Sequence, residues 1–476
     1  MAPGAETSGA VKRAEAFNAK TGFALAFGLF LGLAILKFGN PVILDQKITP
    51  PRALAELVSD FWPTHWAVWV GLPFALAGWS LMRRQPKPWP GTFWLWLLPL
   101  LWLGWEVIAS LNSVDPGLSQ STLPQFAGCI AAYYLGAYLL GSPRRLRWLL
   151  VGMLAAFTVC LMRGIDQRIY EFPQSYQSLT EGQQTGWTNY PPELLVEMKR
   201  DNIIVNTHGQ DIANPVIMAK FGKGRVSGTL VYPNALAGLI LLLLPVALWL
   251  AFNDTKQLKP LIRQAVMGLT LVLGGLAFFF TGSKLGWLLA VALGGLMLFR
   301  LDWSPKLKWL ALALVLIAGL GVFAVRFHKY FAAGATSAGA RFDYWRAAAQ
   351  TTRDYPLLGT GPGTFQRPYA RLKAPEAEMA RLTHNDYLEQ FSDSGVPGGL
   401  AYLAWITLAL TVVGRRIWAR GDPLSVAVFA GVLAWFVQGL GEFSLYIPAL
   451  AWSAFTLLGA LVGLSANEFD KKTAVR

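Results

Sequence analysis

Runs of about 20 apolar residues recur from one end of the 476-residue chain to the other, and they restrict its fold more than any other feature. A helix of roughly 20 apolar residues crosses the hydrocarbon core of a bilayer with every backbone group hydrogen-bonded. Only 14% of the residues are charged, whereas soluble domains carry roughly a quarter. The sequence therefore predicts an all-α polytopic membrane protein, with no soluble domain of ordinary size between its spans.

We predict twelve transmembrane helices from these runs. Only the turn Thr281-Gly282-Ser283 separates the seventh span from the eighth. Glycine and proline inside several runs are compatible with membrane helices, because neighbouring helices satisfy the freed backbone groups. The predicted spans are residues 22–41, 63–82, 92–111, 123–141, 146–164, 227–252, 261–281, 284–300, 307–326, 397–414, 424–441 and 446–465.

The distribution of Lys and Arg predicts the orientation of these spans. Loops near residues 83–90 and 415–423 are rich in Arg, whereas the alternate short loops 112–122 and 442–446 contain neither Lys nor Arg. Because basic residues favour the cytoplasmic side, we expect both termini to be cytoplasmic. The net charge of +14 thus reflects short basic clusters between spans, and no nucleic-acid partner is expected.

Two long segments, residues 165–226 and 327–396, are then expected on the outer side, where they form a cap. The second segment contains a helical pattern followed by the turn-forming sequence 356–363. The predicted organisation is a cytoplasmic tail 1–21, helices one to five in 22–164, an outer loop 165–226, helices six to nine in 227–326, an outer loop 327–396 with the histidine motif, helices ten to twelve in 397–465, and a cytoplasmic tail 466–476.

Three cations at the outer ends of spans form a candidate binding site, namely Arg225, Lys284 and Arg341. Positive charge on the outer side opposes the orientation bias, so each position calls for a reason. Contact with lipid headgroups explains any one of them. The three together suit a phosphate or pyrophosphate carried on a lipid, since Arg binds it bidentately and Lys acts as a point charge.

His384 is the candidate catalytic residue, and it lies in the polar segment 383–389 just before a new span. The ordinary interpretation of a lone histidine is that it satisfies the start of a helix. Its position on the same side as the three cations favours a site instead. A neutral imidazole takes the proton from an incoming hydroxyl, while the cations stabilise a departing pyrophosphate. This combination predicts glycosyl transfer from a lipid pyrophosphate.

Neither a metal nor another cofactor is expected. Asp386 and Glu389 follow His384 at helical spacing, but no second cluster of ligands accompanies them. Cys129 and Cys160 fall inside predicted spans, which argues against a disulfide or a thiolate metal site. No pair of carboxylates stands out as a glycosidase centre.

The motif His384-Asn385, followed after nine residues by Gly395 and then by Gly398, resembles the signature of O-antigen ligases and their polymerase relatives. The resemblance extends over roughly half of the chain, about residues 220–440. Its other parts are Arg225 with Pro233-Asn234-Ala235-Leu236-Ala237, Arg341 with Trp345-Arg346, and Pro356-Leu357-Leu358-Gly359 with Gly361-Pro362-Gly363.

The resemblance implies a metal-independent glycosyltransferase of the bacterial inner membrane. Family members move a glycan from undecaprenyl pyrophosphate to an acceptor hydroxyl at the periplasmic face, and lipid A core is the acceptor we expect first. His384 matches the family's catalytic base, and Arg225 and Arg341 match arginines that hold the pyrophosphate. Asn385 adjoins the histidine in the motif and is taken as substrate-binding. Lys284 stands where many relatives have Arg, so it keeps the charge but loses the bidentate fork.

Two other interpretations remain open. A polymerase that joins repeat units on the same carrier, or a ligase that acts on protein, would belong to the same superfamily. A transporter of polysaccharide or lipid would belong to a different class, in which intramembrane charges mark a substrate path. The charges described above lie at the outer ends of spans and not at the midplane, which favours the enzyme.

Overall fold

The computed structural model of the chain is almost entirely helical, and the predicted all-α polytopic class is confirmed. The tails 1–17 and 474–476 and the loop residues 85–91, for which we predicted the cytoplasmic side, lie outside the described residues. The structure describes residues 18–84, 92–332 and 334–473.

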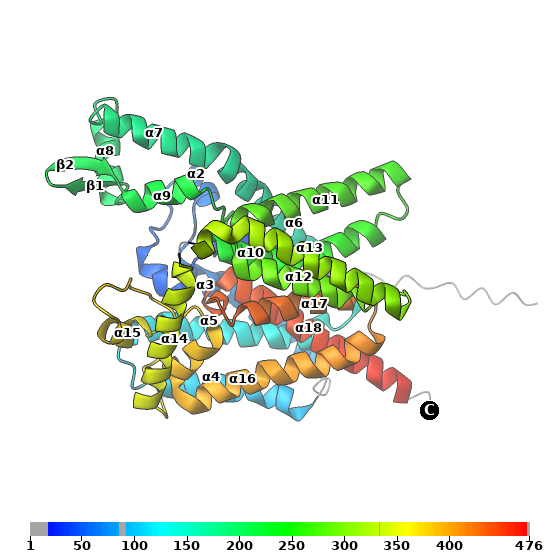
Figure 1. The fold of residues 1–476 in the computed structure, drawn as a ribbon. Coiled ribbons are helices and arrows are strands. Elements are labelled where there is room, and N and C mark those ends of the chain that lie inside the picture. The colour runs from blue at the N-terminus through cyan, green and yellow to red at the C-terminus, as the bar shows by residue number, and fades with distance from the viewer. Residues whose placement is uncertain (1–17, 85–91, 333, 474–476) are drawn as a thin grey trace, which may run out of the picture.

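One long helix corresponds to each predicted span (Figure 1). Within the described residues, nine helices are long and apolar enough to cross a membrane, and α12 and α17 are shorter apolar helices. Since α3 belongs to neither group, the count of twelve stays a prediction. The helices at the predicted spans are α1 (Ala19–Lys37), α3 (Thr64–Arg84), α4 (Phe93–Ser110), α5 (Pro116–Leu135), α6 (Pro143–Asp166), α10 (Pro233–Asn253), α11 (Pro260–Thr281), α12 (Lys284–Leu298), α13 (Pro305–Ala332), α16 (Asp386–Arg420), α17 (Pro423–Gln438) and α18 (Pro448–Thr473).

Shorter elements lie mainly at one end of this bundle, which we call the loop end (Figure 1). The π-helical turn η2 is the exception, because it continues α5 toward the opposite end. These elements are η1 (Val42–Lys47), α2 (Leu54–Ser59), η2 (Gly136–Leu140), η3 (Gln167–Glu171), α7 (Phe172–Gln184), α8 (Pro192–Arg200), β1 (Ile204–Thr207), β2 (Gln210–Ala213), α9 (Pro215–Lys223), α14 (Thr336–Asp354), α15 (Gln366–Leu372) and η4 (Ser444–Tyr446).

Packing of the bundle depends on close approach between helices. The apolar part of α18, Pro448–Ala466, is buried throughout, whereas α13 is largely exposed and faces outward. Helix α1 lies against α6, where a side chain at Gly28 would come within 2.1 Å of the Leu149 carbonyl oxygen. Small residues at such contacts let backbones pack tightly, which drives helix association in lipid.

The predicted outer loop 165–226 is an arm that extends from α6 (Figure 1). Helix α6 continues through η3 into α7, and the antiparallel strands β1 and β2 form a hairpin beyond α8. The arm has its own small core of Leu179, Trp187, Met198, Ile204 and Ala213. The hairpin is a departure from a purely helical chain, and the arm is a folded unit at the loop end.

Helix α16 begins earlier than the sequence predicts. We expected a span from residue 397, but the helix starts at Asp386, directly after His384-Asn385, and includes Gly395 and Gly398 of the motif. It bends at Ser394 and Gly395, where Gly395 has a φ of 68°. This left-handed conformation favours glycine. The α16 helix also continues to Arg420, so the connection to α17 is much shorter than the predicted loop 415–423.

Candidate functional site

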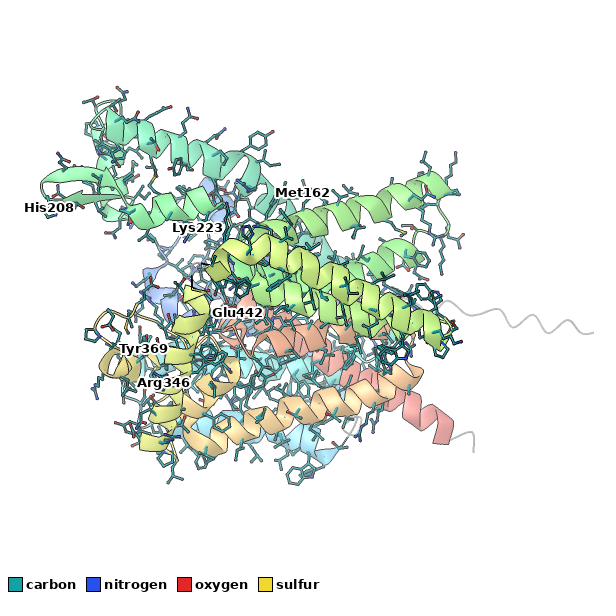
Figure 2. All side chains as sticks on the ribbon, viewed as in Figure 1. Met162, His208, Lys223, Arg346, Tyr369 and Glu442 are labelled. Atoms are coloured by element: carbon teal, nitrogen blue, oxygen red, sulfur yellow. The ribbon has the colours of Figure 1, made fainter. Side chains whose placement is uncertain are left out.

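The residues at the centre of the site surround the carboxylate of Glu442, which lies at the loop end between α17 and α18 (Figure 2). Glu442 is fully buried. Arg341 Nη2 and Asn234 Nδ2 each donate to its Oε1 at 2.7 Å, and the Tyr232 hydroxyl donates to Oε2 at 3.0 Å. Three segments of the chain that are far apart in sequence therefore meet at one carboxylate.

Arg225 joins this group through Asn234. Its Nη2 donates to Asn234 Oδ1 at 2.8 Å, and its Nε donates to the Thr281 carbonyl oxygen at 2.7 Å. Asn234 thus connects the guanidinium of Arg225 to the carboxylate of Glu442. Helix α10 begins at Pro233, so the first turn of this helix presents the amide to both charged groups.

Lys284 lies at the start of α12, as the turn Thr281-Gly282-Ser283 predicted. Gly282 ends α11 with a φ of 57°, and the Ser283 hydroxyl caps α12 by accepting from Gly286 N at 3.2 Å. The Lys284 Nζ lies 3.9 Å from the centre of the Tyr330 ring. The Thr281 carbonyl oxygen, three residues before Lys284, accepts from Arg225 Nε. Lys284 therefore belongs to the same positive region, although it has a cation–π contact with Tyr330.

His384 reaches the site from the segment just before α16. Its Nδ1 lies 3.7 Å from Glu442 Oε2 and is buried without a hydrogen-bond partner. The ring lies between Tyr344 and Phe443, with ring centres 5.9 and 4.7 Å away. The side chain is 29% exposed. The backbone φ of 52° is uncommon for a residue with a side chain, and tertiary contacts hold it.

Asn385 and Asp386 fix the backbone around this histidine. The Asn385 side-chain oxygen caps α16 by accepting from Tyr387 N and Leu388 N at 3.1 and 3.0 Å. The backbone N–H of Asp386 donates to the Glu442 carbonyl oxygen at 3.1 Å. We predicted that Asn385 binds substrate, and the contact described for its side chain is this helix cap. The ordinary role of a helix start thus falls to Asn385, not His384.

The glycines of the motif hold α16 against the turn 356–363. Gly361 N donates to the Asp393 carbonyl oxygen at 2.8 Å, and Val396 N donates to the Pro356 carbonyl oxygen at 2.8 Å. A side chain at Gly395 would come within 2.6 Å of the Pro356 and Leu357 backbone. The glycine-rich turn predicted at 356–363 is therefore a packing element against α16.

Positive charge exceeds negative charge at the site. Burial lowers the pKa of Arg225, Glu442 raises it, and the charges of Arg341 and Arg326 lower it further. Burial also raises the pKa of Tyr344 beside His384, which keeps its hydroxyl protonated. The Nε of Arg341 is buried and has no partner. Several cations around one carboxylate, with unused hydrogen-bond donors, make a site suited to a phosphate-containing anion.

The sequence missed the residue at the centre of the site. Glu442 lies 58 residues after His384, in a short loop that we used only for its lack of Lys and Arg. The signal for it was available, because a carboxylate at the end of a membrane span needs a partner. Asn234 lies in the family motif 233–237, but the sequence predicted no role for it, nor for Tyr232 or Arg326.

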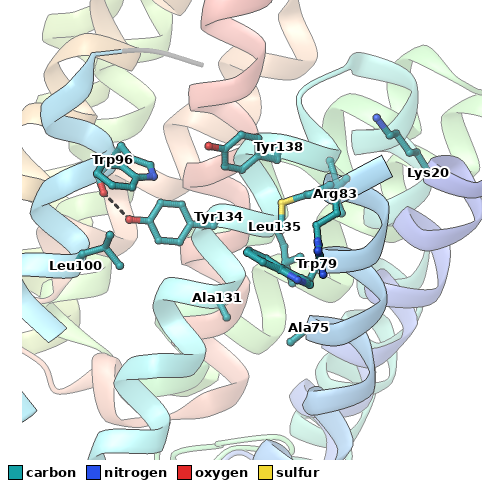
Figure 3. A pocket seen from close by; sticks show the side chains of 12 residues that line it. Lys20, Ala75, Trp79, Arg83, Trp96, Leu100, Ala131, Tyr134, Leu135 and Tyr138 are labelled. Atoms are coloured by element: carbon teal, nitrogen blue, oxygen red, sulfur yellow. Dashed lines mark hydrogen bonds between the residues drawn. The ribbon is translucent and has the colours of Figure 1, made fainter. Parts of the chain in front are cut away.

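Other groups and cavities do not add to this cluster. Among the residues that the structure describes, no group of His, Cys, Asp and Glu is arranged to hold a metal ion. A cavity of about 570 Å³ lies toward the opposite end of the bundle, where Lys20 and Arg83 accompany aromatic and aliphatic side chains (Figure 3). Because it is remote from Glu442, it has no part in the chemistry described above.

The fold and the site together define a polytopic helical membrane protein with a cationic, histidine-containing centre at one end of its bundle. Residues 269–403 match the family model described as O-antigen ligase. This match confirms the resemblance seen in the sequence and supports membership of the O-antigen ligase superfamily. The matched region contains Lys284, Arg341, His384 and Asn385. No curated protein matches the chain at a significant level.

Proposed function

We propose that this protein is a metal-independent glycosyltransferase that moves a glycan from undecaprenyl pyrophosphate to an acceptor hydroxyl, with lipid A core as the first choice of acceptor. The observation that carries the proposal is that Arg341 and His384 face Glu442, while Asn234 joins Arg225 to the same carboxylate. Lys284 lies three residues after Thr281, to which Arg225 donates. Separate chain segments supply an anion site and a base, which are the two parts that such a transfer needs.

In the proposed reaction, the acceptor oxygen forms a bond to the anomeric carbon as the bond from that carbon to the pyrophosphate breaks. The acceptor proton goes to His384, and the negative charge on the departing pyrophosphate is stabilised by the cations. Glu442 faces Nδ1 of the imidazole. A carboxylate on that side favours the tautomer with the proton on Nδ1, which leaves Nε2 free to act as the base. Glu442 is thus a positioning residue.

A direct test uses the purified protein in nanodiscs with an undecaprenyl-pyrophosphoryl glycan and a glycolipid acceptor. The proposal expects a glycosylated acceptor and free undecaprenyl pyrophosphate without any ion gradient. A transporter would give no product under these conditions. The glycolipids of a deletion strain separate ligase from polymerase. Polymer accumulating on the carrier, with none on the core, indicates a ligase, whereas single repeats on the core indicate a polymerase.

Alanine in place of Arg225 or Arg341 is expected to raise the KM for the donor roughly ten- to hundredfold, since a charge-assisted contact contributes ~1.5–3 kcal/mol. Lysine at either position should restore part of this loss, because it keeps charge without the fork. Arg353→Ala is the matched control, since Arg353 lies on the same helix as Arg341, is exposed and is not part of the family motif. Unchanged donor kinetics in both site variants would refute the anion site.

Removal of divalent ions is expected to leave the transfer rate unchanged. The anion site uses guanidinium and ammonium groups, which do the work that a divalent ion does in many phosphoryl enzymes. The measurement is the initial rate after chelation and again after addition of Mg²⁺ or Mn²⁺. Loss of activity on chelation, with recovery on addition of the ion, would show that the transfer depends on a metal ion.

The proposed orientation places the loop end in the periplasm and both termini in the cytoplasm of a bacterial inner membrane. We also expect Trp187 and His384 to be external. Trp187 is buried in the arm, so His208 at the exposed tip of the β1–β2 hairpin is a better labelling position. We expect an impermeant thiol reagent to label His208→Cys but not Asp302→Cys in spheroplasts. The native Cys129 and Cys160 are buried and stay as they are. The opposite labelling would invert the topology.

A further inference from the structure

A second, smaller cavity lies at the loop end, apart from the cation cluster. It has a volume of about 190 Å³ and is bounded by η1, the N-terminal halves of α3 and α5, and α18. Trp69 and Trp452 contribute indole rings to its wall. Its polar lining consists of Asp45, Thr64, His65, Gln120, Ser121 and Gln125. A small cavity with a few placed polar groups and aromatic walls has the composition of a ligand site.

Asp45 and His65 form a fixed polar pair in this wall. His65 Nδ1 lies 2.8 Å from Asp45 Oδ2, and the Thr64 hydroxyl donates to Asp45 Oδ1 at 2.7 Å. The His65 backbone N–H donates to the same oxygen at 3.1 Å. The imidazole remains half exposed, with 54% of its surface accessible. Asp45 therefore fixes the imidazole through Nδ1, and the second ring nitrogen, Nε2, can hydrogen-bond to a ligand.

Gln125 also lines this cavity, and its amide has an unused acceptor. It is almost fully buried, its Nε2 donates to the Leu445 carbonyl oxygen at 2.8 Å, and its Oε1 has no hydrogen-bond partner. The Leu445 carbonyl fixes this orientation, because turning the amide over would place two oxygens together. A buried acceptor without a donor is costly, so this atom calls for a ligand hydroxyl or a water molecule.

Gln125 also connects the cavity to the reaction centre. Leu445, which accepts from Gln125, lies three residues after Glu442 in the turn before α18. Leu445 N in turn donates to the Asp386 carboxylate, next to the histidine motif. The cavity and the cation cluster are therefore on either side of the same short turn.

We propose that this cavity is a glycan subsite that binds one sugar ring of a substrate through its hydroxyl groups. Hydroxyls both donate and accept, so they match the Gln125 amide oxygen, the Asp45–His65 pair and Ser121. The apolar face of a sugar ring suits the indoles. A phosphate does not fit, because Asp45 would repel it. The sugar belongs to the donor or to the acceptor of the proposed reaction. Its assignment to one of these substrates rests on the proposed function, whereas the binding of a sugar to the cavity does not.

Binding is tested with lipid-free oligosaccharides, using the full chain in nanodiscs and saturation-transfer NMR. The probes are the repeat-unit oligosaccharide released by mild acid from the carrier and the core oligosaccharide released from lipid A. We expect one of them to bind, and Ser121→Leu, which fills the cavity, to weaken that binding about tenfold or more. His65→Ala, at a half-exposed position, is expected to weaken it in the same direction.

Ser59→Leu is the control, because Ser59 is exposed at the same end on α2 and does not line the cavity. Equal binding by wild type, Ser121→Leu and His65→Ala would overturn the inference. If neither oligosaccharide binds the wild type, the cavity holds water only and the inference is equally wrong.

Kinetics then identify the source of the sugar. A rise in the KM for the donor in Ser121→Leu, with unchanged KM for the acceptor, assigns the subsite to the donor glycan, and the reverse assigns it to the acceptor. The NMR measurement does not depend on turnover. Absence of any transfer would therefore refute the proposed function and leave the glycan subsite intact. Equal oligosaccharide binding by wild type, Ser121→Leu and His65→Ala would refute the subsite alone.

Discussion

His384→Ala is expected to retain insertion and donor binding but to lose transfer by roughly 10²–10⁴-fold, the contribution of a positioned general base. The expectation follows from the position of the imidazole, which faces Glu442 with Nδ1 and is partly exposed. Turnover per folded molecule is the measurement, with the amount of folded protein determined by size-exclusion chromatography. Undiminished turnover would remove His384 from the mechanism.

His384→Asn separates chemistry from backbone structure. The φ of 52° at this position is tolerated by asparagine better than by most other residues with a side chain. The asparagine variant should therefore fold as well as wild type, and it cannot act as a base near neutral pH. We expect it to be as inactive as His384→Ala. An active asparagine variant with a poorly folded alanine variant would instead indicate a structural histidine.

Glu442→Gln is expected to lower kcat roughly ten- to hundredfold without raising the KM for the donor, because it removes a charge that orients His384 and none that binds an anion. The amide keeps the shape of the side chain and still accepts from Arg341 and Asn234, so the variant should fold. Glu442→Gln thus lowers kcat and leaves the donor KM unchanged, whereas Arg341→Ala raises the donor KM. A raised donor KM with normal kcat would show that Glu442 serves only to hold Arg341.

Glu442→Ala should in addition destabilise the loop end. Removing one partner of a buried ion pair costs about 3–5 kcal/mol, and we expect the lower end of that range because the Arg341 side chain is 22% exposed and reaches water. Thermal unfolding in detergent measures this loss. Glu376→Ala, which removes an exposed acid in the segment between α15 and α16, is the matched control and should leave stability unchanged.

Much of the fold was predictable because membrane helices obey local rules. A run of apolar residues must form a helix in lipid wherever it occurs, so each predicted span has a helix at nearly the same residues. The turn at Gly282-Ser283 was equally predictable, since a left-handed glycine and a capping serine are short-range signals. The arm and the early start of α16 were not, because polar segments between spans carry no comparable period.

The class of protein, the helices, and the histidine and cations that carry the resemblance to O-antigen ligases could thus be predicted from the chain alone. The carboxylate that these residues share could not, because it is brought to them by tertiary contacts. Glu442 reaches them because the Asp386 backbone and side chain bind the turn that carries it, and Asn234 reaches it from the start of α10. Such contacts join residues far apart in the chain, so no local sequence pattern predicts them. An apolar run predicts a membrane helix because its residues are consecutive.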